Sequence, residues 1–318
     1  MKFTAVGDAI IQQKIRPDFC GISEIMPYIM QGDARFFNLE TTLGVEGDSF
    51  ASQFSGGTYL RADPEVLDEV KKFGFNMTTF NNNHTLDFSY GGLYSTLEKL
   101  KTSGLVHTGV GLDIERASAP AFLKTENGTV ALISVNTTFE PSMMAGKISK
   151  LYPGRPGING LRIKRIVNVT QEDINNIRAI ASKTQINAED DCNREGGYLP
   201  PLPDDTAQLG DVYFKAGDSF GLCESIYEED LLRVKKAIDE ANSIADYTII
   251  SVHSHNMDTQ KLELPPKFLV DFCHWSIDNG ANAVIGHGPH LLRPIEVYKD
   301  SPIFYSLGDF IYQGCRNY

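Results

Sequence analysis

The feature of this sequence that most constrains its fold is the alternation of short β-rich runs with helical stretches. Such alternation builds sheets that are covered by helices. The β-rich runs predict strands over 2–6, 35–39, 77–80, 130–135, 247–252, 283–285, 295–298 and 303–306. Starts led by Pro, Asp or Glu, and a Gly after two of the ends, favour helices over 64–73, 92–102, 172–183, 229–243 and 266–278. We therefore expect an α/β (α+β) protein.

One segment interrupts this alternation. Residues 154–221 are rich in Gly, Pro, Asn and Asp, which is typical of turns and loops. Long irregular segments inside a compact domain are usually lids or mobile loops. The 318 residues allow one large domain or two ordinary ones, and 42% hydrophobic residues supply a sizeable core. We expect a single domain over 1–318 with an irregular lid or insertion at about 154–221, the alternative being a plain surface insertion.

Charge and cysteine usage exclude several classes of protein. The 29 Lys and Arg against 41 Asp and Glu give a net charge of −12, without the basic stripe that nucleic-acid binding needs. The five cysteines form no C-x-x-C pair, which excludes a disulfide framework and a thiolate zinc knuckle. Apolar runs are too short for a signal peptide or for the roughly 20 residues of a membrane span. We expect a cytoplasmic protein with no integral membrane segment, and no sequence feature specifies an oligomeric state.

Polar residues that can bind metals stand where predicted strands end. The crevice beyond the carboxyl ends of strands is where α/β sheets bind ligands, so we expect these side chains to converge. They are Asp8, Asn38, Glu40, Asn83, His84, Asp87, His253, His255, His287 and His290. Each motif taken alone has a structural alternative, such as a turn or a cap. His274 lies inside a predicted helix, and we expect it to be structural.

The residue types at these strand ends define the chemistry of the expected site. Carboxylates, imidazoles and amide oxygens suit one or two divalent metal ions, Mn, Fe, Zn or Mg, rather than soft thiophilic ions. Such ions lower the pKa of a water and clamp a phosphoryl oxygen. The sharpest motif is Gly-His-Gly-Pro-His at 286–290, where Gly and Pro fix a tight loop that presents two imidazoles to one point. The spacing of His84 and Asp87 fits an imidazole that is oriented by a carboxylate.

Five ordered strings resemble the CapA family, the capsule-synthesis or poly-γ-glutamate-biosynthesis proteins. They are Val-Gly-Asp at 6–8, Phe-Asn-Leu-Glu-Thr-Thr at 37–42, Asn-Asn-His-Thr-Leu-Asp at 82–87 with Gly-Gly at 91–92, Val-Ile-Gly-His-Gly-Pro-His at 284–290 and Phe-Tyr-Ser-Leu-Gly-Asp-Phe at 304–310. The family is similar to calcineurin-like metallophosphoesterases. The resemblance implies a four-layer sandwich of two mixed sheets flanked by helices, with a dinuclear metal site at the strand ends.

The resemblance also implies a role for each residue of the site. Asp8 and His290 would bind the first metal, and Glu40 would stand in the place of the bridging carboxylate. Asn83, His253 and His287 would bind the second metal. His84 resembles the histidine that protonates the leaving oxygen, with Asp87 holding its ring and tautomer. The phosphoesterase pattern places a His two residues after the first Asp, and this sequence has Ile10 there.

The predicted substrate is anionic. Gly56 and Gly57 could present backbone N–H groups to it, and Arg155 could fork onto phosphate or carboxylate. We also expect Asn38 and His255 to bind the substrate. The net charge of −12 repels a polyanionic chain, which favours a small substrate over an anionic polymer.

Three functions fit these residues. The first is a metal-dependent hydrolase that acts on a phosphoester or related anionic substrate, with His84 as the general acid. The second is a non-catalytic binding or assembly protein for poly-γ-glutamate or for cell-wall or capsule precursors. The third is a decayed site with a structural use only. Ile10 favours the second and third, whereas the set of imidazoles together with the His84 and Asp87 pair favours the first.

Overall fold

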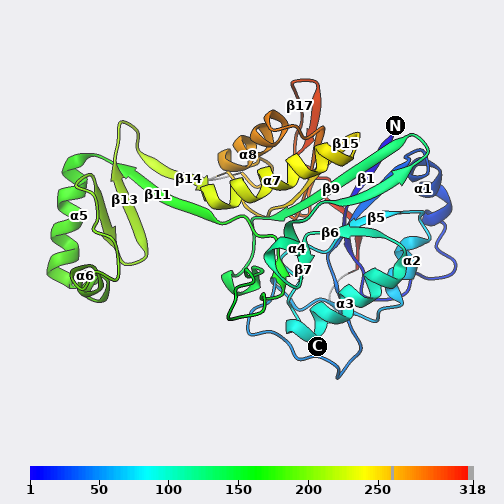
Figure 1. Cartoon of the computed structure of the whole chain (residues 1–318), viewed down its shortest axis with the longest axis horizontal. Coiled ribbons are helices and arrows are strands. Elements are labelled where there is room, and N and C mark those ends of the chain that lie inside the picture. Colours follow the sequence, from blue (N-terminus) through cyan, green and yellow to red (C-terminus); the bar gives the residue numbers. More distant parts are fainter. Residues whose placement is uncertain (259–260, 314–318) are drawn as a thin grey trace. The chain divides into compact units, whose positions relative to one another are not determined.

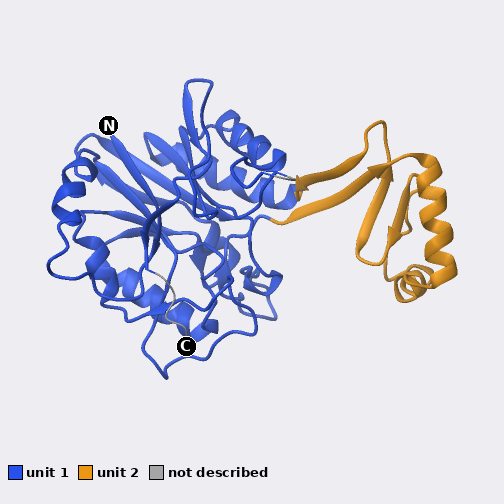
Figure 2. Ribbon diagram, turned by 180° about the vertical axis from the view of Figure 1, so that it is seen from behind, with its two compact units in different colours: residues 1–161, 228–318 blue, residues 162–227 orange. Residues whose placement is uncertain are grey.

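A computed structural model describes residues 1–258 and 261–313 (Figure 1). Contacts between Cα atoms divide the chain into two compact units, coloured separately in Figure 2. Unit 1 comprises 1–161 and 228–318, and unit 2 comprises 162–227. The predicted α/β class is confirmed, because sheets and helices make up the chain. Within the described ranges, no helix combines the length and the apolar character that a membrane span requires.

The first sheet of unit 1 has five strands, all parallel, in the order β19-β1-β2-β5-β6. Its strands are β1 (Phe3–Ile10), β2 (Ala34–Leu39), β5 (Met77–Thr79), β6 (Val106–Thr108) and β19 (Asp309–Tyr312). We predicted two mixed sheets, and for this sheet the prediction is wrong. Among the strands of this sheet, a helix lies between β1 and β2, between β2 and β5, and between β5 and β6, and such crossovers return the chain in the same direction.

The second sheet of unit 1 is mixed, with six strands in the order β17-β18-β16-β15-β9-β8. Its central strands are parallel, and an antiparallel hairpin lies at each edge. Its strands are β8 (Ala121–Thr125), β9 (Gly128–Asn136), β15 (Tyr247–His253), β16 (Ala283–His287), β17 (Ile295–Tyr298) and β18 (Ser301–Phe304). The parallel centre brings the carboxyl ends of β9, β15 and β16 to one edge of the sheet.

Helices and two short strand pairs complete unit 1. The helices are α1 (Gly21–Ile29), α2 (Val66–Lys71), α3 (Ser89–Ser103), α4 (Ile114–Ser118), α7 (Glu228–Ile244) and α8 (Lys267–Asp278), with a 3₁₀ turn at Pro141–Met143. The short pairs are β3 (Thr42–Leu43) with β4 (Arg61–Ala62), and β7 (Val110–Gly111) with β10 (Gly157–Ile158). Helix α7 contacts β9 and β15 (Figure 1). Helix α8 contacts β16.

Alternation along β2 distributes its side chains between two hydrophobic cores. Phe36 belongs to a core that joins residues of both sheets, including Met77 and Ile249. Phe37, its neighbour, belongs to a second core with buried residues of α2 and α3, including Leu93. Successive side chains of a strand point to opposite faces, so the parallel sheet is buried on both sides. Burial on both faces fixes the strand register and therefore the positions of the strand ends.

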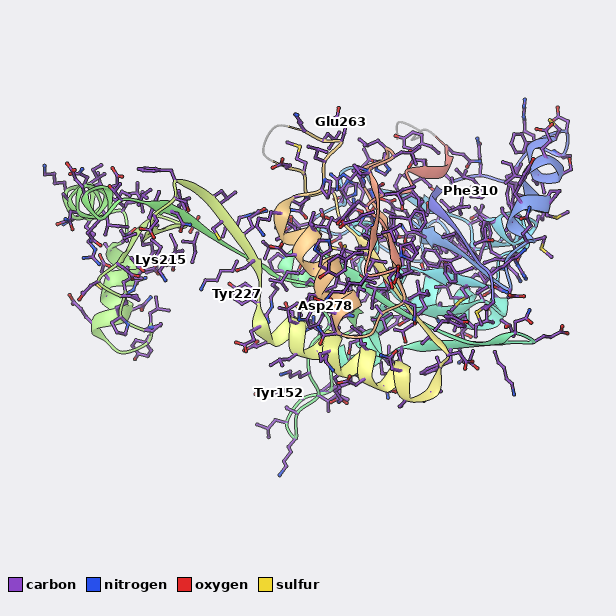
Figure 3. All side chains as sticks on the ribbon, turned by 90° about the horizontal axis from the view of Figure 1, so that it is seen from above. Tyr152, Lys215, Tyr227, Glu263, Asp278 and Phe310 are labelled. Atoms are coloured by element: carbon purple, nitrogen blue, oxygen red, sulfur yellow. The ribbon has the colours of Figure 1, made fainter. Side chains whose placement is uncertain are left out.

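Unit 2 has a sheet, helices and a core of its own. Its elements are β11 (Ile163–Val169), α5 (Gln171–Thr184), α6 (Ala188–Glu195), β12 (Thr206–Leu209), β13 (Val212–Ala216) and β14 (Gly221–Ile226), with the sheet order β12-β13-β11-β14. Lys215 and Tyr227, labelled in Figure 3, belong to this unit. The expectation of an irregular segment at 154–221 is therefore wrong. Its core, which consists of Val169, Ile174 and Ala207, is small. Most positions of unit 2 are therefore polar, and its composition resembles that of a loop.

Candidate metal centre

Both sheets of unit 1 deliver polar side chains to the carboxyl ends of their strands. In the parallel sheet, Asp8 of β1 pairs with Asn38 of β2, and Glu40 follows β2 directly. In the mixed sheet, His253 and His287 are register partners at the last positions of β15 and β16. His287 Nδ1 lies 3.5 Å from Asp8 Oδ1 and His253 Nε2 lies 3.7 Å from Glu40 Oε1, so the two sheets contribute to one cluster.

Asp8 is held in place by a close approach of two backbones. A Cβ on Gly7 would lie 1.7 Å from the carbonyl oxygen of Gly308, so only glycine fits there. The Asp8 amide donates to the same carbonyl at 2.9 Å. The Asp8 carboxylate accepts from Asn38 Nδ2 at 2.7 Å and from the Gly288 amide at 2.9 Å. Complete burial raises the pKa of Asp8 to about 6, and these two hydrogen bonds oppose the rise.

The Glu40 carboxylate lies at the centre of the cluster and is fully buried. Across residues 1–258 and 261–313, no N–H or O–H group donates a hydrogen bond to either of its oxygens. Four imidazole Nε2 atoms surround Oε1, those of His253 at 3.7 Å, His255 at 3.8 Å, His84 at 3.9 Å and His290 at 4.0 Å. These distances are too long for hydrogen bonds. Burial, followed by the charge of Asp8, raises the pKa of Glu40 well above its usual range.

Burial favours the neutral form of the two most deeply buried imidazoles of the cluster. Burial lowers the pKa of His287 to about 3 and that of His253 well below its usual range. The two Nδ1 atoms lie 2.9 Å apart, so at most one of them carries a proton. His253 Nε2 lies 2.8 Å from Asn83 Oδ1, and His287 Nε2 lies 2.7 Å from Ser251 Oγ. Neutral imidazole is the form that binds metal ions.

His84 is fixed by a carboxylate that the backbone holds in turn. Its Nδ1 lies 2.7 Å from Asp87 Oδ2, and its Nε2 faces Glu40. Asp87 accepts from the amides of Gly56 at 2.9 Å and Leu60 at 2.8 Å. The Gly56 amide, which we predicted to meet a substrate anion, is engaged by Asp87 in this structure. Sequence reasoning missed this role because a backbone donor leaves no mark in residue type.

The other residues predicted to bind substrate are divided by the structure. Asn38 is fully buried as the partner of Asp8, and the Gly57 amide donates weakly to Ser55 Oγ at 3.4 Å. Arg155 is exposed, and its Nε donates to the carbonyl of Met144. Among the described residues, the Arg155 side chain makes no hydrogen bond to the histidine cluster. His255 lies within the cluster, its ring centroid 5.0 Å from that of His253.

His274 lies outside the cluster, whereas Asp309 contacts one of its histidines. His274 Nε2 lies 2.9 Å from Glu296, and its ring stacks on Tyr298 outside the cluster, as expected of a structural residue. Asp309 was assigned no role, yet its Oδ1 lies 2.8 Å from His290 Nδ1. Burial opposes the charged form of His290, but that hydrogen bond and the charges of Asp309 and Asp8 together outweigh burial and raise the pKa of His290. The sequence signal for Asp309 is its place as the acidic residue of Phe-Tyr-Ser-Leu-Gly-Asp-Phe at 304–310, the last of the five strings described above.

The cluster fits the requirements of a divalent metal. Three groups have ligand atoms within 4.8 Å of one another: Asp8 with His253 and His287, Glu40 with His253 and His255, and Asp8 with His290 and Asp309. Ligand atoms about 2.1 Å from a shared ion stand up to about 4 Å apart. Glu40 Oε1, Glu40 Oε2 and His255 Nε2 are buried and find no hydrogen-bond partner within the described part of the chain. Buried polar atoms without partners are costly, and a cation would satisfy all three.

Comparison with known proteins assigns the sequence to a family. The sequence matches, over residues 2–314, the family described as bacterial capsule synthesis protein PGA_cap. Two proteins of Sinorhizobium fredii, named uncharacterized proteins y4sH and y4uA, are each 34% identical over 98% of this chain and 66% of their own length.

More distant relatives carry functional names. The capsule biosynthesis protein CapA of Bacillus anthracis is 22% identical over 98% of this chain and 60% of its own length. A probable polyglutamine synthesis accessory protein of Mycobacterium tuberculosis is 24% identical over 89% of this chain and 57% of its own length. The chain thus spans less than two thirds of the length of each of these curated relatives.

Proposed function

The chain belongs to the family of bacterial capsule synthesis protein PGA_cap, and from this premise we propose that unit 1 is a metal-dependent hydrolase acting on a phosphoester or a related small anionic substrate. We further propose that its two large sheets and their helices form a four-layer, metallophosphatase-like sandwich with one or two divalent ions, Mn, Fe, Zn or Mg, at the strand ends. The shared core between the sheets supports this arrangement.

The observation that carries the proposal is the environment of Glu40. A fully buried carboxylate without a hydrogen bond among the described residues, facing four imidazole nitrogens, is unfavourable in a metal-free protein. Around a divalent ion the same atoms would serve as ligands. Asp8 and His290 would hold one ion, and Asn83, His253 and His287 the other, with Glu40 between them. When bound, such ions act as Lewis acids toward a phosphoryl oxygen and acidify water.

The proposed general acid is His84. Asp87 accepts from His84 Nδ1, which fixes the ring and leaves Nε2 facing the centre. The Gly56 and Leu60 amides hold Asp87, so the imidazole keeps its direction when it gives a proton to the leaving oxygen. The full burial of Asp87, Glu40 and Asp8 excludes bulk water from this part of the site.

Metal analysis combined with an assay on an aryl phosphate tests the proposal. Protein stripped with a chelator and reloaded with Mn²⁺ is expected to retain metal after gel filtration and to release the phenol. His84→Asn should keep its metal but lose about a hundredfold or more in turnover, the usual scale of acid–base catalysis. His274→Asn, a histidine on α8 outside the cluster, is the matched control and should match the wild type in both measurements.

A second candidate function is the binding or assembly of an anionic polymer or precursor without turnover. Ile10, in place of a ligand histidine, and the names of the distant relatives support it. Stoichiometric metal without turnover of phosphomonoesters, phosphodiesters or related esters would favour this candidate. Failure of the wild type to retain any divalent metal would contradict both functions in their metal-dependent form.

A further inference from the structure

Ile10 leaves the first metal of the proposed centre without one of the ligands that the phosphoesterase pattern supplies. A hydrocarbon side chain cannot bind a cation, and Ile10 is buried. We propose that Asp309, at the start of β19, supplies this ligand and completes a first metal site with Asp8 and His290. The inference rests on the proposed function, because it concerns the same ions.

The strand register places Asp309 beside Asp8. Strands β1 and β19 run parallel, and Asp8 is the register partner of Asp309. The next pair is Ala9 with Ile311, so β19 carries one extra residue, Phe310, at this point. Bulges of this kind re-aim side chains and are over-represented next to active sites.

Phe310 and Asp309 have different surroundings. The Phe310 ring packs edge-on against Phe73 at 4.9 Å and Phe75 at 5.4 Å, in the core that includes buried residues of α2 and α3. The Asp309 carboxylate instead faces the histidine cluster, with Oδ1 2.8 Å from His290 Nδ1.

The three side chains are spaced as ligands of one ion. One ligand atom from each of Asp8, His290 and Asp309 lies within 4.8 Å of the other two. His290 adopts a left-handed backbone conformation with φ of 56°, which is uncommon for a residue with a side chain. Gly288, two residues earlier, donates its amide to Asp8 at 2.9 Å and so ties this loop to the first ligand. Strain that the structure retains at such a position is typical of functional sites.

A different role for Asp309 is to orient the His290 ring without touching the ion. The hydrogen bond between Asp309 Oδ1 and His290 Nδ1 is compatible with that role. Asp309→Asn separates the two roles, because an amide oxygen still accepts from Nδ1 but, being neutral, is a weaker ligand than a carboxylate. Ile10→His also distinguishes the two roles, because a histidine at position 10 can bind the ion but cannot orient the His290 ring.

The experiment measures metal, not only activity. Chelator-treated protein is titrated with Mn²⁺ by calorimetry, its metal content is determined after gel filtration, and the visible spectrum of the Co²⁺ form is recorded. Wild type should bind two equivalents. Asp309→Asn should lose one equivalent or bind it at least tenfold more weakly, with a changed Co²⁺ spectrum. Asp271→Asn, in which an exposed aspartate on α8 loses its pairing with Lys267, is the control and should behave as wild type.

Adding Ile10→His to Asp309→Asn should restore the second equivalent. The inference is overturned if Asp309→Asn binds two equivalents of metal with wild-type affinity and spectrum. It is also overturned if the double variant folds but binds only one equivalent. If the double variant does not fold, the Co²⁺ spectrum of Asp309→Asn decides. A wild type that binds no metal would instead refute the proposed function, so the two failures are distinguishable.

Discussion

Glu40→Gln should have opposite effects on the metal-free and the metal-loaded protein. Without metal, the folded state holds Glu40 as a buried acid whose pKa is raised well above its usual range, first by desolvation and then by Asp8. The folded state therefore binds the proton more tightly than the unfolded chain does. Stability is then lost as the pH rises above the ordinary glutamate pKa toward the raised value. A glutamine carries no such penalty, so metal-free Glu40→Gln should be more stable than metal-free wild type, increasingly so from pH 5 to pH 8.

With metal the order reverses. An ion that binds only the folded state at a hundred times its dissociation constant stabilises the protein by about 2.7 kcal/mol. One kcal/mol corresponds to roughly 2–4 °C in the melting temperature of a domain of 150–250 residues, so metal should raise the wild-type melting temperature by about 5–10 °C. Because Glu40 faces four imidazole nitrogens and stands between the two proposed ions, its replacement should remove most of this rise.

Thermal melts of chelator-treated protein, with and without Mn²⁺, at pH 5, 6.5 and 8 measure both effects. Glu296→Gln is the matched control, since Glu296 also pairs with a histidine but lies outside the cluster. Its metal-dependent rise should equal that of the wild type. A full metal-dependent rise in Glu40→Gln would refute the ligand role of Glu40. Lower stability of metal-free Glu40→Gln at every pH would refute the account of its burial.

Three further predictions test other parts of unit 1. Gly7→Ala should lower the free energy of unfolding by about 3 kcal/mol, because the new Cβ meets a carbonyl oxygen, whereas Gly44→Ala, with only ordinary contacts, should stay near wild type in a denaturant titration. Arg293→Met removes two hydrogen bonds to carbonyls at 256 and 262 and should cost about 1–3 kcal/mol, with faster amide exchange in residues 254–258. Replacing 162–227 by a short Gly-Ser linker should leave metal content unchanged, because every proposed ligand belongs to unit 1; loss of metal would contradict this.

The parts of the fold that the sequence predicts are those with buried apolar runs. Strands β1, β2, β5, β9, β15 and β16 lie within a few residues of their predicted ranges. Because these strands are parallel at the centre of each sheet, their carboxyl ends meet, and the polar residues that follow are brought together. Residue type at a strand end was therefore enough to nominate Asp8, Glu40, His253 and His287.

The parts that could not be predicted depend on contacts between distant segments. Asp309 reaches the centre because β19 pairs with β1, about 300 positions away in the chain, and no local pattern encodes that register. Gly56 serves Asp87 through its backbone amide, a group that every residue but proline carries. The strands of unit 2 escaped prediction because β13 and β14 are largely exposed and lack a clear apolar alternation.

Exposure across the cluster indicates where the proposed substrate would approach it. The side chains of Asp8, His253 and His287 are completely buried, whereas those of His255, His290 and Asp309 are 27%, 32% and 21% exposed. The buried members are held by neighbouring strands, which makes them suited to retain an ion. The partly exposed members lie where solvent reaches the cluster, so a substrate oxygen would approach the proposed ions at that edge. If Asp309 is a ligand, the first metal lies at this open edge and should exchange with added Mn²⁺ faster than the second.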